Sequence, residues 1–178
     1  YTATISYNEA AAMSHIGSYH PKVLGCIEIL RSGNHIYTVM QYCPGGDLYH
    51  KILEGPENNK TIRRYSEGQA RVWFRQLLLG LAHLQKKGVC HGAISLENIL
   101  LDEKENLVIA YFGQALRVPY TQLNNSLGIA DVSGGSFRRL IKLQQGKSIN
   151  GATRYMSPEL LAKDQAFDGY AADLWSTA

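Results

Sequence analysis

The chain has 178 residues, of which 45% are hydrophobic and 19% charged, and its formal net charge is +3. This is the composition of one ordinary globular domain and excludes wholesale disorder. The small positive charge gives no reason to expect a nucleic-acid partner, and no apolar run is long enough to predict a membrane span. The three cysteines, Cys26, Cys43 and Cys90, are far apart. We expect reduced thiols in the cytoplasm or another reducing compartment.

Local patterns predict four elements in the first third of the chain: helices over 7–19 and 47–53, and strands over 23–30 and 35–42. Good helix formers favour the first helix, and Gly17 marks its end. Alternating apolar, β-branched and aromatic residues indicate the two strands, which a turn at Ser32-Gly33-Asn34 would join into a hairpin.

The longest predicted helix begins at Ser66. Ser66-Glu67-Gly68-Gln69 matches a capping box, in which two side chains cover free backbone amides. Apolar residues then repeat at intervals of three and four, which predicts one buried face. These residues are Ala70, Trp73, Phe74, Leu77, Leu81 and Leu84. Gly88 ends the helix, and residues 99–101 and 107–109 predict two short strands around the turn 102–106.

The segment 119–150 is unusually long for a connection without structure of its own. It reads as an insertion that is either mobile or used for docking. Within it, residues 137–143 favour a short helix.

Four short motifs follow one another along the chain: His91-Gly92-Ala93 with Asn98 seven positions after the histidine, Tyr111-Phe112-Gly113, Ser157-Pro158-Glu159 and Asp173-Leu174-Trp175. Their order and spacing resemble those of a eukaryotic protein kinase. In that family the first motif begins His-Arg-Asp and the second reads Asp-Phe-Gly. The run from 36 to 48 is similar to the family's fifth strand and the hinge that follows it.

The resemblance implies an α+β, bilobal kinase-like fold of which this chain holds a part. Residues 1–43 would belong to the small lobe, with helix C, strands 4 and 5 and the start of the hinge. Residues 44–178 would belong to the large lobe, with helices D and E, the catalytic loop, a long activation segment and the start of helix F. The Gly-rich loop and third-strand Lys would lie before Tyr1. We therefore expect a longer chain or protein partners to cover the cut faces.

The resemblance also indicates where ATP would lie. The family's adenine and ribose contacts fall on Met40, Gln41, Cys43, Asp47 and Leu100. Asp47 has an alternative role as a helix N-cap. Glu9 corresponds to the helix C acid that pairs with the third-strand Lys. Asn98 corresponds to a magnesium ligand, although an amide there can equally hydrogen-bond the loop.

The residues that perform phosphoryl transfer in the family are replaced at four positions, Ala93, Ser95, Tyr111 and Ala152. The family places there the Asp that accepts the substrate proton, a Lys that steadies the phosphate, the Asp that holds magnesium, and a Thr that touches the first two. Gly92 replaces an Arg that receives an activation-loop phosphate. Structural positions of the family are kept at His91, Phe112, Gly113, Glu159 and Asp173. Four residues, His91, Phe112, Met13 and Cys26, fall on the positions that stack as its regulatory spine.

Three functions remain open from the sequence. The joint loss of linked catalytic groups favours a pseudokinase that acts as a scaffold or interaction module. The first alternative is an active or weakly active Ser/Thr kinase, and the second is a switch that binds ATP without magnesium and transfers no phosphate.

Overall fold

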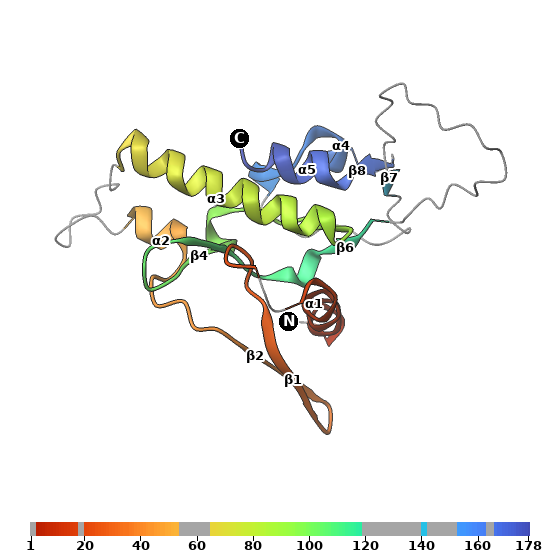
Figure 1. Ribbon diagram of the computed structural model, residues 1–178. Coiled ribbons are helices and arrows are strands. Elements are labelled where there is room, and N and C mark those ends of the chain that lie inside the picture. Colours follow the sequence, from red (N-terminus) through yellow and green to blue (C-terminus); the bar gives the residue numbers. More distant parts are fainter. Residues whose placement is uncertain (1–2, 18–19, 54–64, 119–139, 142–152, 163–165) are drawn as a thin grey trace, which may run out of the picture.

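The computed structural model describes residues 3–17, 20–53, 65–118, 140–141, 153–162 and 166–178. It is mixed α+β, as predicted, with every strand in an antiparallel pair (Figure 1). The helices are α1 (Ala3–Ile16), α2 (Leu48–Leu53), α3 (Glu67–Lys86), α4 (Pro158–Leu161) and α5 (Gly169–Trp175). The pairs are β1 (Cys26–Ser32) with β2 (His35–Met40), β3 (Val89–Cys90) with β6 (Leu116–Arg117), β4 (Ile99–Leu101) with β5 (Leu107–Ile109), and β7 (Leu140–Ile141) with β8 (Phe167–Asp168). Short 3₁₀ turns are η1 (Leu96–Asn98), η2 (Phe112–Gln114) and η3 (Thr153–Tyr155).

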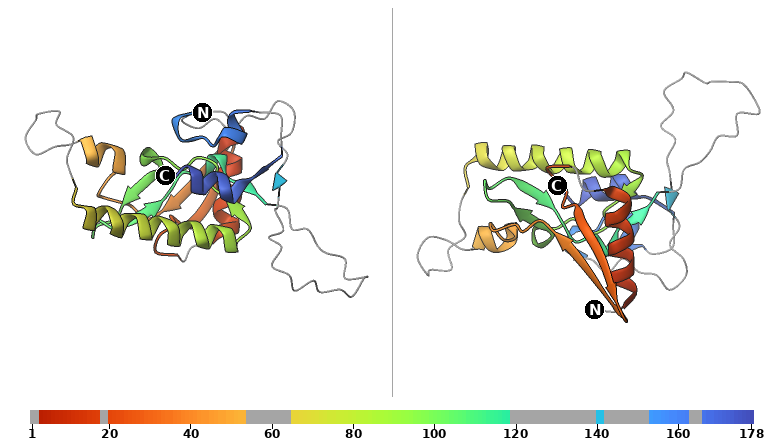
Figure 2. Two further views of the ribbon diagram at one scale, coloured as in Figure 1. Left: turned by 90° about the horizontal axis from the view of Figure 1, so that it is seen from above. Right: turned by 60° about the horizontal axis from the view of Figure 1, so that its bottom comes forward.

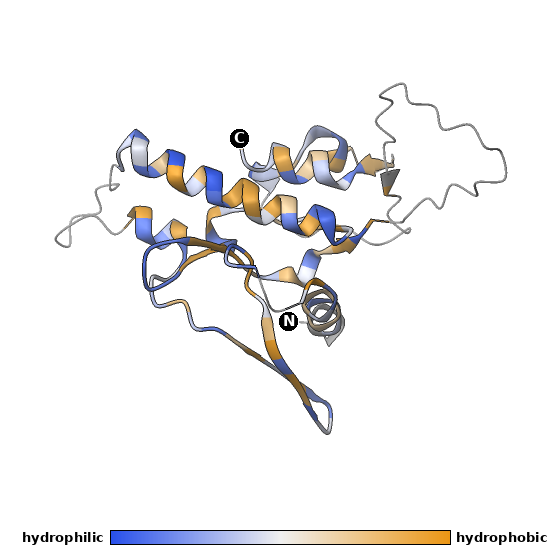
Figure 3. Ribbon diagram, viewed as in Figure 1, coloured by the Kyte–Doolittle hydropathy of each residue, from blue (hydrophilic) through white to orange (hydrophobic). Residues whose placement is uncertain are grey.

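Helix α3 is the long central element, and α5 runs along one side of it in all views (Figures 1 and 2). Ser66 caps it by accepting a hydrogen bond from the Gln69 amide at 3.2 Å, which confirms this part of the predicted capping box. Its buried residues are Trp73, Leu77, Gly80, Leu81 and Leu84. The prediction is wrong for Ala70 and Phe74, which are both exposed. Phe74 is 46% exposed because one position along a helix turns a side chain by about 100° from the buried Trp73. Hydrophobic and hydrophilic residues alternate along α3 (Figure 3).

The main core forms where α3 packs on the β4–β5 pair. Gly80 permits this close approach, because a Cβ there would lie 2.6 Å from Ile109 Cδ1 and 2.8 Å from the Lys22 carbonyl oxygen. Leu101, Leu107 and Ile109 are at most 1% exposed beneath the helix. The predicted strands 99–101 and 107–109 are confirmed residue for residue.

The β1–β2 hairpin projects from the rest of the molecule (Figure 1). Strand β1 starts and ends two or more residues later than predicted, and β2 stops at Met40. Figure 3 shows orange stretches on both strands of the hairpin. The exposed large apolar side chains of the two strands are Ile27, Ile29, Leu30, Tyr37, Val39 and Met40. Each of these side chains keeps more than a third of its surface exposed in the described part of the chain.

Two other predictions needed correction. Helix α1 begins at Ala3, not at residue 7, and ends at Ile16. Leu140 and Ile141 form strand β7, which contradicts the predicted helix over 137–143 at these positions. The reason is a distant partner, because β8 pairs with both residues. The rest of the segment 119–150 lies outside the described residues, as do residues 54–64.

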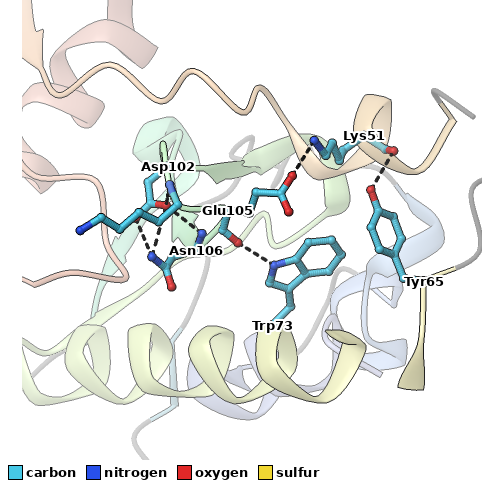
Figure 4. Close-up of polar contacts among 7 residues, drawn as sticks. Lys51, Tyr65, Trp73, Asp102, Glu105 and Asn106 are labelled. Carbon is cyan, nitrogen blue, oxygen red and sulfur yellow. Dashed lines mark hydrogen bonds and ion pairs between the residues drawn. The ribbon is translucent and has the colours of Figure 1, made fainter. Parts of the chain in front are cut away.

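A polar network ties α2 and α3 to the β4–β5 turn (Figure 4). Lys51 Nζ lies 2.9 Å from a carboxylate oxygen of Glu105, and Trp73 donates its indole N–H to the Glu105 carbonyl at 2.9 Å. Tyr65 donates its hydroxyl to the Lys51 carbonyl at 3.3 Å. The turn carrying Glu105 therefore holds both helices.

In the described part of the chain, no helix is both long and apolar enough to cross a membrane.

Candidate functional site

The loop between β3 and η1 is anchored from α5 by a single carboxylate. Asp173 accepts the backbone N–H of His91 at 2.6 Å and that of Gly92 at 2.8 Å. Asp173 is 5% exposed, and burial raises its pKa to about 7, although the two amide hydrogen bonds act in the opposite direction. The loop conformation thus depends on a group that is 81 residues away in sequence from Gly92.

The His91 ring is a buried structural group. Its Nε2 lies 2.9 Å from the Ala110 carbonyl oxygen, and its Nδ1 accepts the Ala93 backbone N–H at 3.2 Å. These partners require a neutral ring protonated on Nε2. Burial lowers the pKa of His91 to about 4, against a smaller opposite effect of the Ala110 carbonyl. The ring meets Phe112 edge to face, with centroids 5.2 Å apart.

Helix α1 contacts the same region from the other side. Met13 and Phe112 are 2% and 0% exposed and belong to one core cluster, against which the partly buried Cys26 packs. Glu9 accepts the Phe112 backbone N–H at 3.1 Å. The four positions assigned to a spine therefore form a continuous packed group, and the Glu9 carboxylate is directed to the Tyr111-Phe112-Gly113 segment.

Tyr111 lies at the edge of this packed group and points into solvent. It is 55% exposed and adopts a left-handed backbone, with φ 64° and ψ 73°. For a residue with a Cβ this conformation costs about 1–2 kcal/mol. Phe112 and Gly113 follow in η2, where Phe112 turns into the core. The strained position is thus occupied by a neutral phenol.

Ala93 and Asn98 are joined by a hydrogen bond that closes the loop. Asn98 Nδ2 donates to the Ala93 carbonyl at 2.8 Å, which is the loop-bracing alternative for this amide. Ser95 is buried and begins η1. An alanine methyl and a neutral phenol offer no anionic oxygen, so Ala93 and Tyr111 do not suit a magnesium ion. Ala152 lies outside the described residues.

Metal-binding side chains do not cluster elsewhere in the described part of the chain. Across the described ranges, no group of three or more His, Cys, Asp or Glu side chains is placed to hold a metal ion. All three cysteines are free: Cys26 is partly buried, and Cys43 and Cys90 are buried.

The residues assigned to a nucleotide are only partly brought together. Asp47 and Leu100 form an isolated β-bridge, so they are neighbours. Met40 is 38% exposed at the end of β2. Gln41 and Cys43 line a hollow with His20, Pro21, Val23, Leu24, Gly25, Asp102 and Val108, and Met40, Asp47 and Leu100 are not part of its lining.

The Asp47 carboxylate acts as a helix cap. It accepts the His50 backbone N–H at 2.9 Å, and its Oδ2 lies 2.8 Å from the His50 ring nitrogen Nδ1. Burial opposes its ionisation, but these His50 hydrogen bonds outweigh burial and hold the pKa of Asp47 below its ordinary value. The N-cap alternative is therefore the geometry that the structure shows.

The third motif starts helix α4. Ser157 is its N-cap and is fully buried, and its Oγ has no hydrogen-bond partner in the described part. Glu159 lies in the first turn and is partly buried. Ser176 of α5 donates its hydroxyl to the Tyr155 carbonyl at 2.7 Å, which links η3 to the helix that carries Asp173.

Sequence reasoning missed two backbone carbonyls that shape the loop. One belongs to Ala110, which accepts from His91. The other belongs to Gln114: Gly92 has φ +73°, and a Cβ added to it would lie 2.8 Å from the Gln114 oxygen. The glycine at position 92 was the available signal, because left-handed backbone and close contact both favour glycine.

Comparisons with known proteins agree with this geometry. A family profile described as protein kinase domain matches residues 2–178. The chain is 35% identical over 157 residues to hormonally up-regulated neu tumor-associated kinase homolog B of Xenopus laevis, covering 88% of this chain and 21% of that protein. It is 34% identical to the Homo sapiens kinase of the same name, covering 88% and 18%, and 32% identical to CBL-interacting serine/threonine-protein kinase 13 of Arabidopsis thaliana, covering 88% and 26%. The chain thus spans about a fifth to a quarter of the length of these relatives. It belongs to the protein kinase domain family.

Proposed function

We propose that this chain is a pseudokinase module, which keeps the kinase frame for interaction with other proteins and transfers no phosphate. The observation that carries the proposal is the pair Ala93 and Tyr111. Each stands where the family has a carboxylate, and hydrogen bonds from Asp173 and Asn98 hold the loop that carries Ala93. The proposal includes the division into a small-lobe part, 1–43, and a large-lobe part, 44–178.

The chemistry of phosphoryl transfer explains why these two positions matter. The reaction depends on positioning and on neutralising phosphate charge with bound metal. Ala93 offers its carbonyl oxygen to Asn98 and has no side-chain acceptor for a substrate proton. Tyr111 carries a phenol where the family has a metal-binding carboxylate. Removing one group of such a unit typically lowers turnover on the order of 10⁴-fold, and loss of several leaves little to measure.

A phosphotransfer assay on the full-length protein tests the proposal. With radiolabelled ATP, magnesium and a generic Ser/Thr substrate, we expect incorporation at the background level. Two variants separate transfer by this protein from transfer by a contaminating kinase. Leu100→Trp fills the space beside Asp47. Leu174→Trp, at a 52% exposed position, is its matched control. Transfer that survives in Leu174→Trp and disappears in Leu100→Trp would refute the proposal.

A second candidate function is a switch that binds ATP without magnesium. The bridge between Asp47 and Leu100 supports it, because two of the nucleotide positions remain neighbours. Thermal unfolding of the full-length protein in millimolar ATP, with and without magnesium, separates the candidates. A rise in Tm that magnesium does not change would favour the switch. If Tm rises in neither condition, the switch is refuted and the interaction module is the remaining candidate.

Protein partners are supported by the exposed hairpin. Six large apolar side chains of β1 and β2 are 38% to 68% exposed in the described part of the chain. Such a surface typically meets protein. Surface substitution Ile27→Lys, at a 68% exposed residue, should weaken any association that uses the hairpin without unfolding the domain.

A further inference from the structure

Three histidines gather where the end of α1 meets the end of α3. The rings of His20 and His83 stack, with centroids 4.4 Å apart and planes 14° from parallel. His15 Nε2 lies 2.8 Å from the carbonyl oxygen of Lys87, the C-cap of α3. The backbone of Ile16, the last residue of α1, also acts on the His83 ring. We call His15, His20 and His83 the histidine cluster; His15 lies in α1, His20 in the segment that follows this helix, and His83 in α3.

Most charged groups around the stacked pair are cations. Partial burial lowers the pKa of both His20 and His83, and nearby positive charges lower each further. For His20 these are His83, Lys22 and Lys86; for His83 they are Lys87 and Lys86. The backbone of Ile16 acts in the opposite direction on the pKa of His83. The surroundings therefore favour two neutral rings.

Asp102 is the acid that faces this region. It lines a hollow together with His20 and lies close to Lys22. Its carboxylate accepts the backbone N–H of Lys104 at 2.8 Å and that of Asn106 at 2.8 Å. It also accepts the Asn106 side-chain amide at 3.0 Å. The carboxylate is thus engaged in its own turn and offsets part of the charge of Lys22, whereas Lys86 and Lys87 do not act on it.

The position of α1 has consequences at the candidate site. This helix carries Glu9, which accepts the Phe112 N–H, and Met13, which packs in the same core as Phe112. At the opposite end of the helix, His15 lies against the Lys87 carbonyl, and the segment after α1 stacks His20 on His83. A displacement of this end of α1 would therefore also change the contacts of Glu9 and Met13 with Phe112.

We propose that the His20–His83 pair is a proton-sensitive latch, which holds the end of α1 on α3 while both rings are neutral and releases it when both are protonated. Protonation would place two positive charges side by side among three lysines. The released arrangement binds protons more readily than the latched one, so acid shifts the equilibrium towards release. This regulation does not depend on whether the domain transfers phosphate.

Hydrogen exchange of the full-length protein tests the latch. Amide hydrogen exchange of residues 3–16 is compared at pH about 7.5 and about 5.5, a range in which unperturbed histidines titrate. The rates are corrected for the intrinsic pH dependence of exchange. We expect protection to fall at least about fivefold in the wild type. This factor corresponds to the repulsion, in water, between two unit charges at the 4.4 Å that separates the ring centroids. His83→Phe keeps a ring for stacking but cannot titrate, so its loss should stay below about twofold. His35→Phe, at an exposed position of β2, should behave as the wild type.

An equal loss of protection in the wild type and His83→Phe would overturn the proposal, as would no loss in the wild type. His20→Phe provides the same comparison if His83→Phe does not fold. NMR titration adds an independent readout: the His20 ring should titrate at higher pH in His83→Phe, because a neighbouring charge has been removed. An unchanged His20 titration would also contradict the latch.

Discussion

The two ends of the candidate site have opposite characters. At one end, His91 and Gly92 are held by the buried Asp173, and the Asn98 amide braces the Ala93 carbonyl. At the other end, Tyr111 is strained and 55% exposed. The anchoring hydrogen bonds use backbone atoms, whereas the family's chemistry uses side-chain charges. The comparison teaches that the hydrogen bonds holding this loop need no carboxylate at position 93 or 111.

The largest expected effect comes from removing the anchor. Asp173→Ala leaves two buried N–H groups unpaired, so we expect the free energy of unfolding to fall by about 3–5 kcal/mol. Urea unfolding followed by tryptophan fluorescence measures it. Leu174→Ala, at the adjacent exposed position, serves as the control and should change stability by less than about 1 kcal/mol. Similar values for the two variants would show that Asp173 does not hold the loop.

Adding a methyl group to the loop should have the next largest effect. Gly92→Ala places a Cβ 2.8 Å from the Gln114 oxygen in left-handed backbone, and we expect a loss of about 2–3 kcal/mol. Gly46→Ala is the matched control, with φ +67° and nothing within 4 Å of the added atom. Its loss should reflect backbone strain alone, about 1 kcal/mol. If both variants lose the same amount, the contact with Gln114 contributes nothing.

The role of Asn98 is tested by a nearly isosteric change. Asn98→Asp replaces the donor to the Ala93 carbonyl with an acceptor, so we expect a loss of about 1–2 kcal/mol. Thermal unfolding with and without magnesium measures the loss and any recovery. Recovery of wild-type Tm by magnesium would show that position 98 faces a metal site, contrary to the loop-bracing role.

The smallest effect concerns pH. The pKa of His91 is about 4 in the folded protein and about 6.5 when unfolded, so between these pH values only the unfolded ring binds a proton. The contribution of His91 to stability therefore rises with pH from about 4 to about 6.5. Folded Asp173 keeps its proton up to a pKa of about 7, against 3.8 when unfolded, so its contribution falls as pH rises from 3.8 to 7. In the wild type the two contributions oppose each other.

Asp173→Asn removes the second contribution and leaves the first. Between pH about 5 and 6, we expect the stability of this variant to rise more steeply with pH than that of the wild type, by up to about 1.4 kcal/mol per pH unit. Urea unfolding at several pH values measures both slopes. Equal slopes would mean that Asp173 is ionised in the folded protein throughout this range.

Local signals predicted much of the fold. The Ser66 cap and the strands 99–101 and 107–109 depend on residues close together in sequence, and the structure confirms them. Strand β7 was predicted as helix because its partner β8 lies about 26 residues further on, beyond the reach of a local pattern. Phe74 satisfied the helical repeat but lies beside the buried stripe, which only the packing of α3 defines.

The candidate site, like the fold, was predicted where short motifs determine it and missed where distant residues meet. Sequence motifs located His91, Asn98 and Tyr111, but the alternatives for Asp47 and Asn98 needed hydrogen-bond partners to separate them. The Ala110 and Gln114 carbonyls carry no side-chain signature. The histidine cluster joins residues from two distant segments, so no spacing in the sequence points to it.

The binding of magnesium with ATP tests most directly whether the frame has lost its charges. Isothermal titration of the full-length protein with ATP, with and without magnesium, is compared between the wild type and Tyr111→Asp. We predict that magnesium leaves the wild-type affinity unchanged within about twofold, since a neutral phenol gives the ion no anionic ligand. A wild-type affinity that magnesium raises tenfold or more, a gain of about 1.4 kcal/mol, would contradict the account.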